Sequence, residues 1–448
     1  MNIELPENIE YTIKTLEASG FDAYIVGGCV RDSLMGKTPK DWDVTTSALP
    51  EQVKEAFPEH VIIDLGLKFG TVALLPHQPP HEPVEITTFR LDGAYSDNRH
   101  PESVIFSDNL KEDLSRRDFT VNAMAYNPKI GIVDMFGGKK DLEDGIIRCV
   151  GNPDKRFQED ALRIMRAMRF ASVFGFTVHR ETSNAMLEHK SLLRNISAER
   201  IANELNKMIV GQGIGEELLI HRDIIAEIIP ELIPTFGFMQ NNPHHLWEVY
   251  LHTAQSIQYA TSDVVIRLTM LFHDIAKPQC YTEKDGIGHF YGHAQISSDI
   301  AKEVLSRLKY DNSTIKAVTE LVLNHDADIE PRRKHIKRRL NKIGEVRLRQ
   351  LIEVKKADAM AHAEPYRQER LDKLSKIPSM ISEIIEQRQC IAIKDLAVNG
   401  SDLMEIGISE GPRIGELLNH LVDMVIDETI ENDKDDLLKA ARDSAIDN

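Results

Sequence analysis

The first third of the chain contains short apolar segments that are rich in β-branched residues and end at glycine or proline. Short segments of this kind, bounded by turn-forming residues, are typical of β-strands. Polar stretches and short helical segments separate them, so we expect a small mixed α/β domain here. The expected strands are residues 23–26, 43–46, 61–63, 71–75 and 84–89.

From about residue 155 onward the pattern of apolar positions becomes helical. Residues 160–174 contain no glycine or proline, and Leu162, Met165 and Phe170 stand among arginines, which predicts a helix. The polar run 241–243, Asn-Asn-Pro, predicts a tight turn or a boundary. The predicted fold class is therefore α+β, with a small mixed α/β head followed by an all-helical neck, body and tail.

Composition sets further bounds on this picture. A chain of 448 residues corresponds to about two to four domains. Its net charge of −17 argues against a protein coated with basic surface for non-specific nucleic-acid binding. Residues 401–448 hold 13 Asp and Glu against 4 Lys and Arg, so about half of the negative excess lies in the tail. The basic run 332–339 is either a solvated helix face or a contact for RNA phosphates.

The spacing of the cysteines and the length of the apolar runs indicate the cellular compartment of the protein. Cys29, Cys149, Cys280 and Cys390 lie far apart, without the short spacing of a zinc site, as expected for reduced thiols in a cytoplasmic protein. The N-terminus lacks a basic region followed by an apolar run, and no apolar run approaches the ~18 residues of a membrane span. We therefore expect a cytoplasmic protein that does not cross a membrane.

A glycine turn and a pair of aspartates supply the first candidate chemistry. Gly27-Gly28 ends the first expected strand, so the backbone there can approach a ligand closely, and Arg31 adds a forked cation for phosphate. Asp41 and Asp43 follow at the spacing that places both side chains on one face of a strand. Two such carboxylates are either exposed residues at a strand edge or ligands of a divalent ion such as magnesium. Their position after the turn favours two-metal nucleotidyl transfer.

Four motifs occur in the order of a known family. They are Gly-Gly-x-Val-Arg-Asp from Gly27, Asp-x-Asp from Asp41, Arg-Arg-Asp-Phe-Thr-Val-Asn-Ala from Arg116 and Glu-Asp-x-x-Arg from Glu159. In this the chain resembles the class II CCA-adding enzymes and bacterial poly(A) polymerases of the polymerase-β nucleotidyltransferase superfamily. The resemblance covers about residues 20–215 with strong motifs and extends more weakly to the end.

The resemblance implies roles for individual residues. It makes Asp41 and Asp43 the catalytic magnesium ligands. Glu85 is either a third carboxylate of that site or an exposed strand residue. The helix expected at 196–205 would brace the neck, and the segment 89–101 would be the mobile loop that enzymes adding the final A possess. The implied nucleotide-binding residues are Gly28, Arg31, Arg117, Asp118, Asp160, Arg163, Arg166 and Arg169.

The selection of C and A has a simple chemical basis. Asp160 and Arg163 are three residues apart in an expected helix and would share a face, offering an acceptor beside a donor. Cytosine and adenine both present an exocyclic amine next to a ring-nitrogen acceptor, whereas uracil and guanine present the reverse. A buried mismatch costs about 1–3 kcal/mol per unmatched group. The alternative is a common intrahelical ion pair.

A second candidate centre lies in the helical half of the chain. An isolated histidine is usually an ordinary core or surface residue, but here several occur with aspartates in the order found in HD-domain phosphohydrolases. The surroundings of the His-Asp pair, residues 271–278, predict an apolar helix, where charged groups are costly unless paired or metal-bound. Imidazole and carboxylate together suit manganese, nickel, iron or zinc. The implied ligands are His252, His273, Asp274, His293, His325 and Asp358, and whether they catalyse phosphoester hydrolysis is left open.

Together these features predict a CCA tRNA nucleotidyltransferase that uses CTP, ATP and magnesium on tRNA, with a second divalent transition metal in the HD domain. An A-adding enzyme or poly(A) polymerase, and an HD phosphohydrolase with an inactive head, are the alternatives. The oligomeric state is left open. The expected domains are a nucleotidyltransferase head (1–126), a base-recognising neck (127–215), an HD domain (216–362) and a helical, tRNA-contacting tail (363–448).

Overall fold

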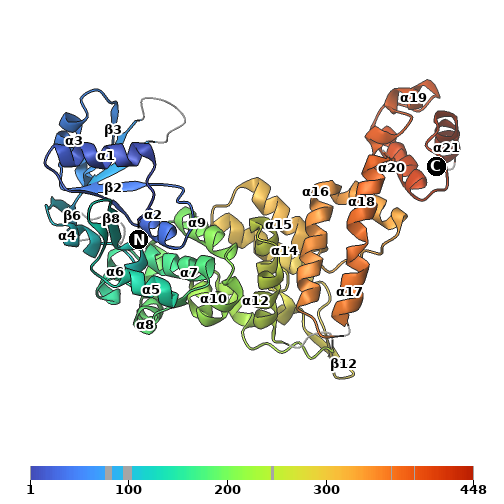
Figure 1. Cartoon of the computed structure of the whole chain (residues 1–448). Helices are drawn as coiled ribbons and strands as arrows, with labels where there is room; N and C mark the ends of the chain where they lie inside the picture. The colour runs from blue at the N-terminus through green and yellow to red at the C-terminus, as the bar shows by residue number, and fades with distance from the viewer. Residues whose placement is uncertain are drawn as a thin grey trace. The chain divides into compact units, whose positions relative to one another are not determined.

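The computed structural model describes residues 2–75, 83–93, 103–243, 247–364, 366–387 and 389–446. The chain forms two compact units, Met1–Pro230 and Glu231–Asn448. The first holds all the strands of the large sheet, and the second is almost entirely helical (Figure 1). The predicted α+β class is confirmed, whereas the finer division into four domains stays a prediction.

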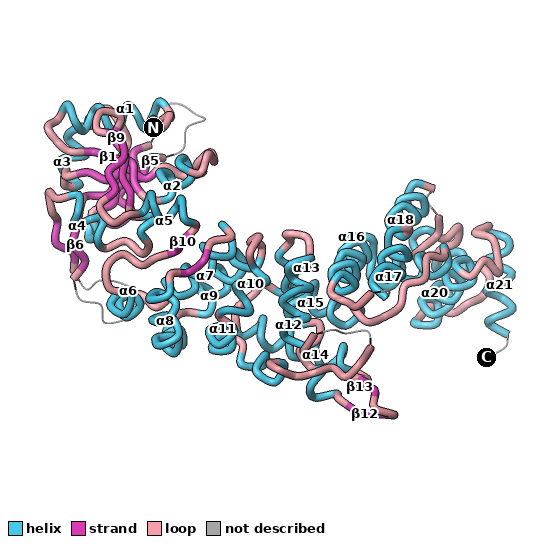
Figure 2. Tube along the Cα trace, turned by 60° about the horizontal axis from the view of Figure 1, so that its bottom comes forward, coloured by secondary structure: helices cyan, strands magenta, loops and turns pink. Residues whose placement is uncertain are grey.

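The centre of the first unit is a seven-stranded sheet, drawn together in magenta in Figure 2. Only β2 and β5 run parallel among its neighbouring strands. All five strands expected from the sequence are present, two with the expected ends and three with an end shifted by one to three residues. In sheet order the strands are β3 (Ile62–Gly66), β4 (Thr71–Leu74), β5 (Val84–Thr88), β2 (Asp43–Thr46), β1 (Ala23–Val26), β8 (Met124–Asn127) and β9 (Gly131–Asp134).

Helix α1 (Glu7–Ala18) covers one face of this sheet. Its residues Ile9, Ile13 and Leu16 are spaced by three or four, so they lie along one side of the helix. They pack in one core with strand residues such as Ile25 and Val44. Burial of these side chains, at about 1.5–3 kcal/mol each, holds β1 and β2 in place beside each other.

The remaining strands of the first unit form two small sheets. β6 (Arg90–Asp92) pairs with β7 (Val104–Phe106), and β10 (Ile146–Ile147) pairs with β11 (Thr177–Val178). Most of the loop expected at 89–101 lies outside the described residues. The other helices of this unit are α2 (Gly28–Leu34), α3 (Pro50–Ala56), α4 (Leu110–Ser115), α5 (Gly138–Asp144), α6 (Pro153–Glu159), α7 (Leu162–Phe174), α8 (Arg180–His189), α9 (Ala198–Ile209), α10 (Ile214–Ile220) and α11 (Arg222–Ile228).

The helix expected at 160–174 begins later than predicted. Asp160 has φ −140° and ψ 102°, an extended conformation, and α7 starts at Leu162. The Asp160 carboxylate accepts a hydrogen bond from the Leu162 amide at 3.1 Å. A short acidic side chain can bond its own backbone in this way, which competes with helix formation and separates α6 from α7.

The second unit packs its helices around two apolar clusters. One joins α15 and α16 to α18, and the other lies among α19, α20 and α21. Within the described part of the chain, no helix combines the length and apolar character needed to span a membrane. The elements are α12 (Val249–Tyr259), α13 (Val264–Phe272), β12 (Thr282–Lys284), β13 (Ile287–His289), α14 (His293–Arg307), α15 (Asn312–Asn324), α16 (Arg333–Met360), α17 (Tyr366–Ser375), α18 (Ile377–Glu386), α19 (Gly400–Glu405), α20 (Pro412–Ile426) and α21 (Lys434–Ile446).

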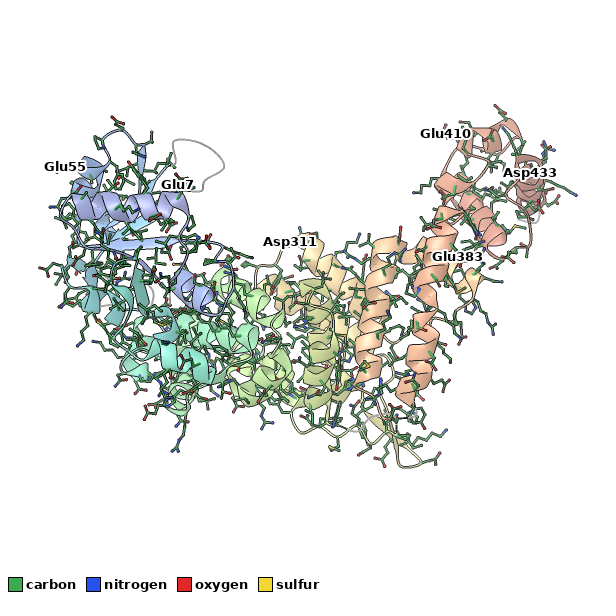
Figure 3. All side chains as sticks on the ribbon, in the orientation of Figure 1. Glu7, Glu55, Asp311, Glu383, Glu410 and Asp433 are labelled. Carbon is green, nitrogen blue, oxygen red and sulfur yellow. The ribbon has the colours of Figure 1, made fainter. Side chains whose placement is uncertain are left out.

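The basic run 332–339 lies at the start of α16, and several of its cations already have acidic partners. Lys334 and Arg338 lie 3.1 Å and 2.7 Å from Asp427 of the acidic tail, and Arg333 lies 2.8 Å from Glu383. Figure 3 labels Glu383 among the acidic side chains of this unit. These pairs are partly exposed, so each stabilises the fold by only about 0–1 kcal/mol and leaves the cations able to exchange partners.

Candidate nucleotide-transfer site and metal-ligand cluster

Three carboxylates gather where β2 and β5 lie side by side. Asp43, the first residue of β2, stands in register with Glu85 of β5, and Asp41 lies two residues earlier. Burial raises the pKa of Asp43. The positive charge of Arg117 lowers this pKa, and the negative charge of Asp41 raises it. Burial and the charges of Asp43 and Asp41 raise the pKa of Glu85. Carboxylates that repel one another and offer hard oxygen donors fit a divalent cation.

The glycine turn brings an arginine to the end of β1. Gly27 has φ 83°, a conformation that favours glycine, and α2 begins directly after it. A Cβ at Gly27 would lie 3.0 Å from Nη1 of Arg117, tighter than most such contacts. The guanidinium of Arg117 is also held by the buried Asp113, 3.3 Å away. The turn is therefore shaped to let Arg117 lie against the backbone beside Asp43.

A strongly basic cavity of about 580 Å³ opens beside this turn. Its lining mixes six cations with three carboxylates, an excess of three positive charges. Guanidinium groups bind phosphate oxygens with two parallel hydrogen bonds, so this charge and size suit a triphosphate. The cations are Arg31, Lys37, Arg117, Arg166, Arg169 and Lys207, and the carboxylates are Asp32, Asp43 and Asp118.

Asp118 is the centre of a hydrogen-bond network within this cavity. Its carboxylate accepts from Arg166 Nε at 2.8 Å and from Asn122 Nδ2 at 3.1 Å. Burial opposes ionisation, yet Arg166 and the bond from Asn122 lower the pKa of Asp118 well below its usual range. Asn122 also accepts a hydrogen bond from Arg31. The sequence assigned no role to Asn122 of the third motif. In the structure this residue links Arg31 to Asp118.

Helix α9 contacts Arg169 of α7 and Asp160 just before that helix. Glu204 lies 3.1 Å from Nε of Arg169, and Arg200 lies 3.3 Å from Asp160. Asp113 and Glu204 were not identified from the sequence as positioning residues. Asp113 contacts Arg116 and Arg117 at spacings of three and four residues, a signal that the sequence offered, whereas Glu204 meets Arg169 through tertiary packing. The contacts from 200 and 204 agree with the bracing role expected for residues 196–205.

A second cavity, of about 610 Å³, lies on the other side of Asp43. Asp41, Asp43 and Glu85 line it together with apolar side chains that include Ile63 and Leu65 of β3. Asp43 is the residue that lines both cavities. Asp43 thus faces both the basic cavity and the second cavity, whereas Asp41 and Glu85 line the second alone.

Asp160 and Arg163 do not share a helix face, contrary to prediction, because Asp160 precedes α7. Arg163 is buried and lies 2.8 Å from Glu159, the helical type of ion pair that the sequence left as the alternative. It also donates to the backbone carbonyls of Arg156 and Arg116, at 3.2 Å and 3.1 Å. Neither Asp160 nor Arg163 lines the basic cavity. A role for the pair in base recognition stays a prediction.

All six residues of the second predicted centre converge in the helical unit. His273 and Asp274 directly follow α13, rather than lying within it as predicted, and His325 directly follows α15. His273 lies 3.1 Å from Asp274, and His252 of α12 lies 3.0 Å from Asp358 of α16. Three groups of potential ligand atoms form there, each with all atoms within 4.8 Å of one another: His252, His273 and Asp274; Asp274, His293 and His325; and His252, Asp358 and His362.

His362 is a member of this cluster that the sequence analysis did not identify. It lies one helical turn beyond Asp358, with Nδ1 3.8 Å from the Asp358 carboxylate. The spacing of four residues from Asp358 was the available signal. Burial and the neighbouring His252 lower the pKa of His362 to about 4, although Asp358 opposes the shift. His362 and Arg370 line a cavity of about 300 Å³ that also contains Asp274, His293 and His325.

Family comparisons match three parts of the chain. Residues 23–148 match the poly A polymerase head domain, and residues 175–235 match a domain described as a probable RNA and SrmB-binding site of polymerase A. Residues 279–441 match a putative tRNA nucleotidyltransferase domain 2.

Similar proteins extend these matches to the full length. A CCA-adding enzyme of Levilactobacillus brevis is 33% identical over 442 residues, which cover 98% of this chain and 99% of the relative. That of Geobacillus kaustophilus is 33% identical, covering 94% and 93%. The crystal structure of the Bacillus stearothermophilus CCA-adding enzyme in complex with CTP superposes with a TM-score of 0.70 at 29% identity, covering 97% of this chain and 96% of that one.

Proposed function

Because the chain belongs to the CCA-adding enzymes, we propose that it adds C, C and A to the 3′ end of tRNA from CTP and ATP without a nucleic-acid template. The observation that supports this best is the position of Asp43 between the basic cavity and the second cavity. A nucleoside triphosphate occupies the basic cavity, and the tRNA 3′ end approaches from the other side.

In the reaction, the 3′-oxygen of the tRNA forms a bond to the α-phosphorus of the incoming nucleotide. The bond from that phosphorus to the bridging oxygen breaks, pyrophosphate leaves, and the 3′-hydroxyl loses its proton. Asp41 and Asp43, with Glu85 as the third carboxylate, would hold magnesium, which would supply positive charge at the 3′-oxygen and the triphosphate. The closeness of these carboxylates and the raised pKa values of Asp43 and Glu85 support this assignment.

The arginines of the basic cavity orient the triphosphate. Arg31, Arg117 and Arg166 are each held by an acidic or amide partner, so their guanidinium groups are positioned before the nucleotide binds. Such preorganisation limits the entropy lost on binding and keeps the α-phosphorus in line with the 3′-oxygen. The carboxylate of Asp118 lies among them, at the place where a ribose hydroxyl can donate to it.

Asp160 and Arg163 select the base in this proposal. Asp160 accepts from the exocyclic amine of cytosine or adenine, and Arg163 donates to the neighbouring ring nitrogen. For this, Arg163 must exchange its bonds to Glu159 and the two backbone carbonyls for the base. Nucleotide binding therefore includes a local rearrangement at the junction of α6 and α7.

The experiment that tests the main proposal uses three tRNA substrates, ending at the discriminator base, at C and at CC, each with every NTP. The proposal predicts C incorporation on the first two and A incorporation on the third. An enzyme that extends only the CC-ending substrate, and by a single A, is an A-adding enzyme. An enzyme that adds A repeatedly is a poly(A) polymerase. Product length on a sequencing gel distinguishes all three.

The helical unit supports a second activity, hydrolysis of a phosphoester at a divalent metal centre. Among the described residues, five histidines and two aspartates lie together at this site, and such an ionisable cluster is costly unless a ligand compensates it. Mixed imidazole and carboxylate donors fit a transition metal such as manganese, nickel, iron or zinc. In hydrolysis, water oxygen bonds to phosphorus, the bond to the alcohol oxygen breaks and the alcohol leaves with a proton. Release of phosphate or of a free hydroxyl from model esters tests the activity.

A further inference from the structure

Two aromatic side chains, here called the aromatic pair, form part of the wall of the basic cavity. Phe170 and Phe174 lie one turn apart on α7, and their rings stack with centres 5.7 Å apart and planes inclined by 11°. Phe170 is buried, Phe174 is half-buried, and both line the cavity. Phe119 meets the Phe170 ring edge to face, with the centres 5.8 Å apart. The reaction described above assigns no role to either ring of the pair.

Cations of the cavity lie against both rings of the aromatic pair. The guanidinium carbon of Arg169 lies 4.1 Å from the centre of the Phe170 ring, and that of Arg31 lies 5.3 Å from it. Arg31 also lies 4.8 Å from the centre of the Phe174 ring, and Nζ of Lys37 lies 5.2 Å from it. All these distances are within about 6 Å, the range over which the negative face of an aromatic ring attracts a cation.

The cations around the pair repel one another, because three guanidinium groups share the Phe170 ring. Arg166 supplies the third, 5.5 Å from the ring centre. Burial lowers the pKa of Arg169, and the charges of Arg166 and Arg31 lower it further, although two neighbouring carboxylates oppose the shift. Another carboxylate would hold the cations together but would neutralise the charge that a triphosphate needs. An aromatic ring carries no net charge, so it attracts each cation and leaves the positive charge available to phosphate oxygens.

We propose that Phe170 and Phe174 are positioning residues for nucleotide transfer, which hold the cations of the basic cavity in place for the triphosphate of any incoming nucleotide. The inference rests on the proposed function, since that function places the triphosphate in this cavity. Phe174 contacts two cations from another part of the chain. Arg31 of α2 and Lys37, three residues beyond the end of that helix, are thereby held toward α7.

The expected effect of the aromatic pair does not depend on the base. CTP and ATP share the triphosphate, so weakening the pair should reduce kcat/KM for both nucleotides by the same factor. It should also weaken the binding of inorganic triphosphate, which has no base. Loss of the two cation contacts of Phe174 corresponds to a roughly 5- to 30-fold rise in Kd. The aromatic pair thus differs from Asp160, whose substitution should change the ratio between nucleotides.

The test measures the binding of inorganic triphosphate with magnesium to the full-length chain by isothermal titration calorimetry. Phe174 is replaced by phenylalanines with one, two and three ring fluorines, which withdraw electron density from the ring face and hardly change its shape. The Kd should rise with each fluorine, and Phe174→Leu should raise it roughly 5- to 30-fold. Phe176→Leu is the matched control and should leave the Kd nearly unchanged. The Phe176 ring lies 5.5 Å from that of Phe174, but Phe176 is not among the described residues that line the cavity.

The outcomes separate this inference from the proposed function. If the chain adds C, C and A but has the same Kd throughout the fluorine series, or binds no inorganic triphosphate, the function stands and the role of the aromatic pair is overturned. If it adds no nucleotide to tRNA but shows the rising series, the function falls, while the pair still positions cations for a triphosphate. Neither addition nor binding overturns both. The fluorinated rings keep the shape of phenylalanine, so the series decides the matter even if Phe174→Leu fails to fold.

Discussion

At the scale of single residues, the pairing of Asp43 with Glu85 explains why the proposed metal site lies at the start of β2. Parallel strands place Asp43 in register with Glu85, and Asp41 adds a third negative charge nearby. The repulsion among these groups is removed by a divalent ion, so the local instability of the cluster is linked to its affinity for metal. The same residues that are costly without metal are those that the reaction needs.

Asp41→Ala and Asp43→Ala are each expected to abolish incorporation of both CTP and ATP under magnesium. A metal ion contributes several kcal/mol to the transition state, so the rate should fall roughly a thousand-fold or more. Single-turnover kinetics measures the loss, and a melting curve should show that the fold is kept. Robust activity in either folded variant would exclude these residues as essential ligands.

Asp160→Asn is expected to change which nucleotide is used. The amide keeps an acceptor for the Leu162 amide, so the start of α7 should survive, but it can also donate to the carbonyl of uracil. The CTP-to-UTP ratio of kcat/KM should fall by about 1–3 kcal/mol, or roughly 5- to 150-fold. An unchanged ratio in folded protein would place base selection elsewhere.

Glu159→Gln is the matched control for this experiment, because it weakens the ion pair with Arg163 while leaving Asp160 intact. A purely structural role for Arg163 predicts that Arg163→Ala melts earlier and slows every nucleotide alike. Base recognition predicts a selective loss with CTP and ATP. Melting temperatures and kcat/KM for CTP, ATP and UTP on matched primers separate the two.

At the scale of elements, the pair of Asp118 and Arg166 joins the residues that follow α4 to helix α7. Asn122 donates a hydrogen bond to Asp118 on one side of this pair. On the other side, Glu204 of α9 pairs with Arg169, which neighbours Arg166 on α7. The orientation of α7 relative to the sheet therefore depends on charged contacts as well as on the apolar core. Such buried pairs are sensitive to the loss of one partner.

The pH dependence of stability tests this link. The folded-state pKa of Asp118 is lowered, so its ionised form stabilises the fold above the unfolded pKa of about 4, and this contribution is lost as the pH falls toward the folded value. Asp118→Asn should lower the melting temperature at pH 7, by an amount that shrinks as the pH is reduced below about 4. Asp144→Asn, which removes an exposed ion pair with Lys140, should change little at either pH. Equal losses for Asp118→Asn at all pH values would contradict the ionic account.

At the scale of the whole molecule, the two candidate centres belong to different compact units. Every residue of the nucleotide-transfer site lies within Met1–Pro230, and every residue of the histidine cluster lies within Glu231–Asn448. No ligand residue is common to both, so their chemistries should be separable.

His273→Ala is expected to remove metal from the helical unit and any phosphoester hydrolysis, while CCA addition stays within about two-fold of the unmodified chain. Asp41→Ala should have the opposite pattern. Metal analysis, ester hydrolysis and CCA addition are measured on the same preparations. A matching loss of CCA addition in well-folded His273→Ala would show that the two units are coupled.

The sequence by itself determined the strands and the order of the motifs, and it supplied candidate residues for both centres, because these depend on local composition and spacing. Short segments rich in β-branched residues and bounded by glycine or proline predicted β1 to β5, and the spacing of aspartates and histidines indicated candidate ligands before any contact was known. Two predictions were wrong at this local level. A side-chain bond to the backbone of Leu162 outweighed the helical pattern at Asp160, and α13 ends at Phe272, before His273 and Asp274.

The tertiary structure alone decided which of these residues meet. The register of Asp43 with Glu85, the pairing of Asp118 with Arg166 and the meeting of His252 with Asp358 arise from chain segments far apart in sequence. Helical periodicity places a residue on a face but not opposite a particular partner. Packing of the apolar cores sets those partners, because burying them fixes how the strands and helices lie against one another.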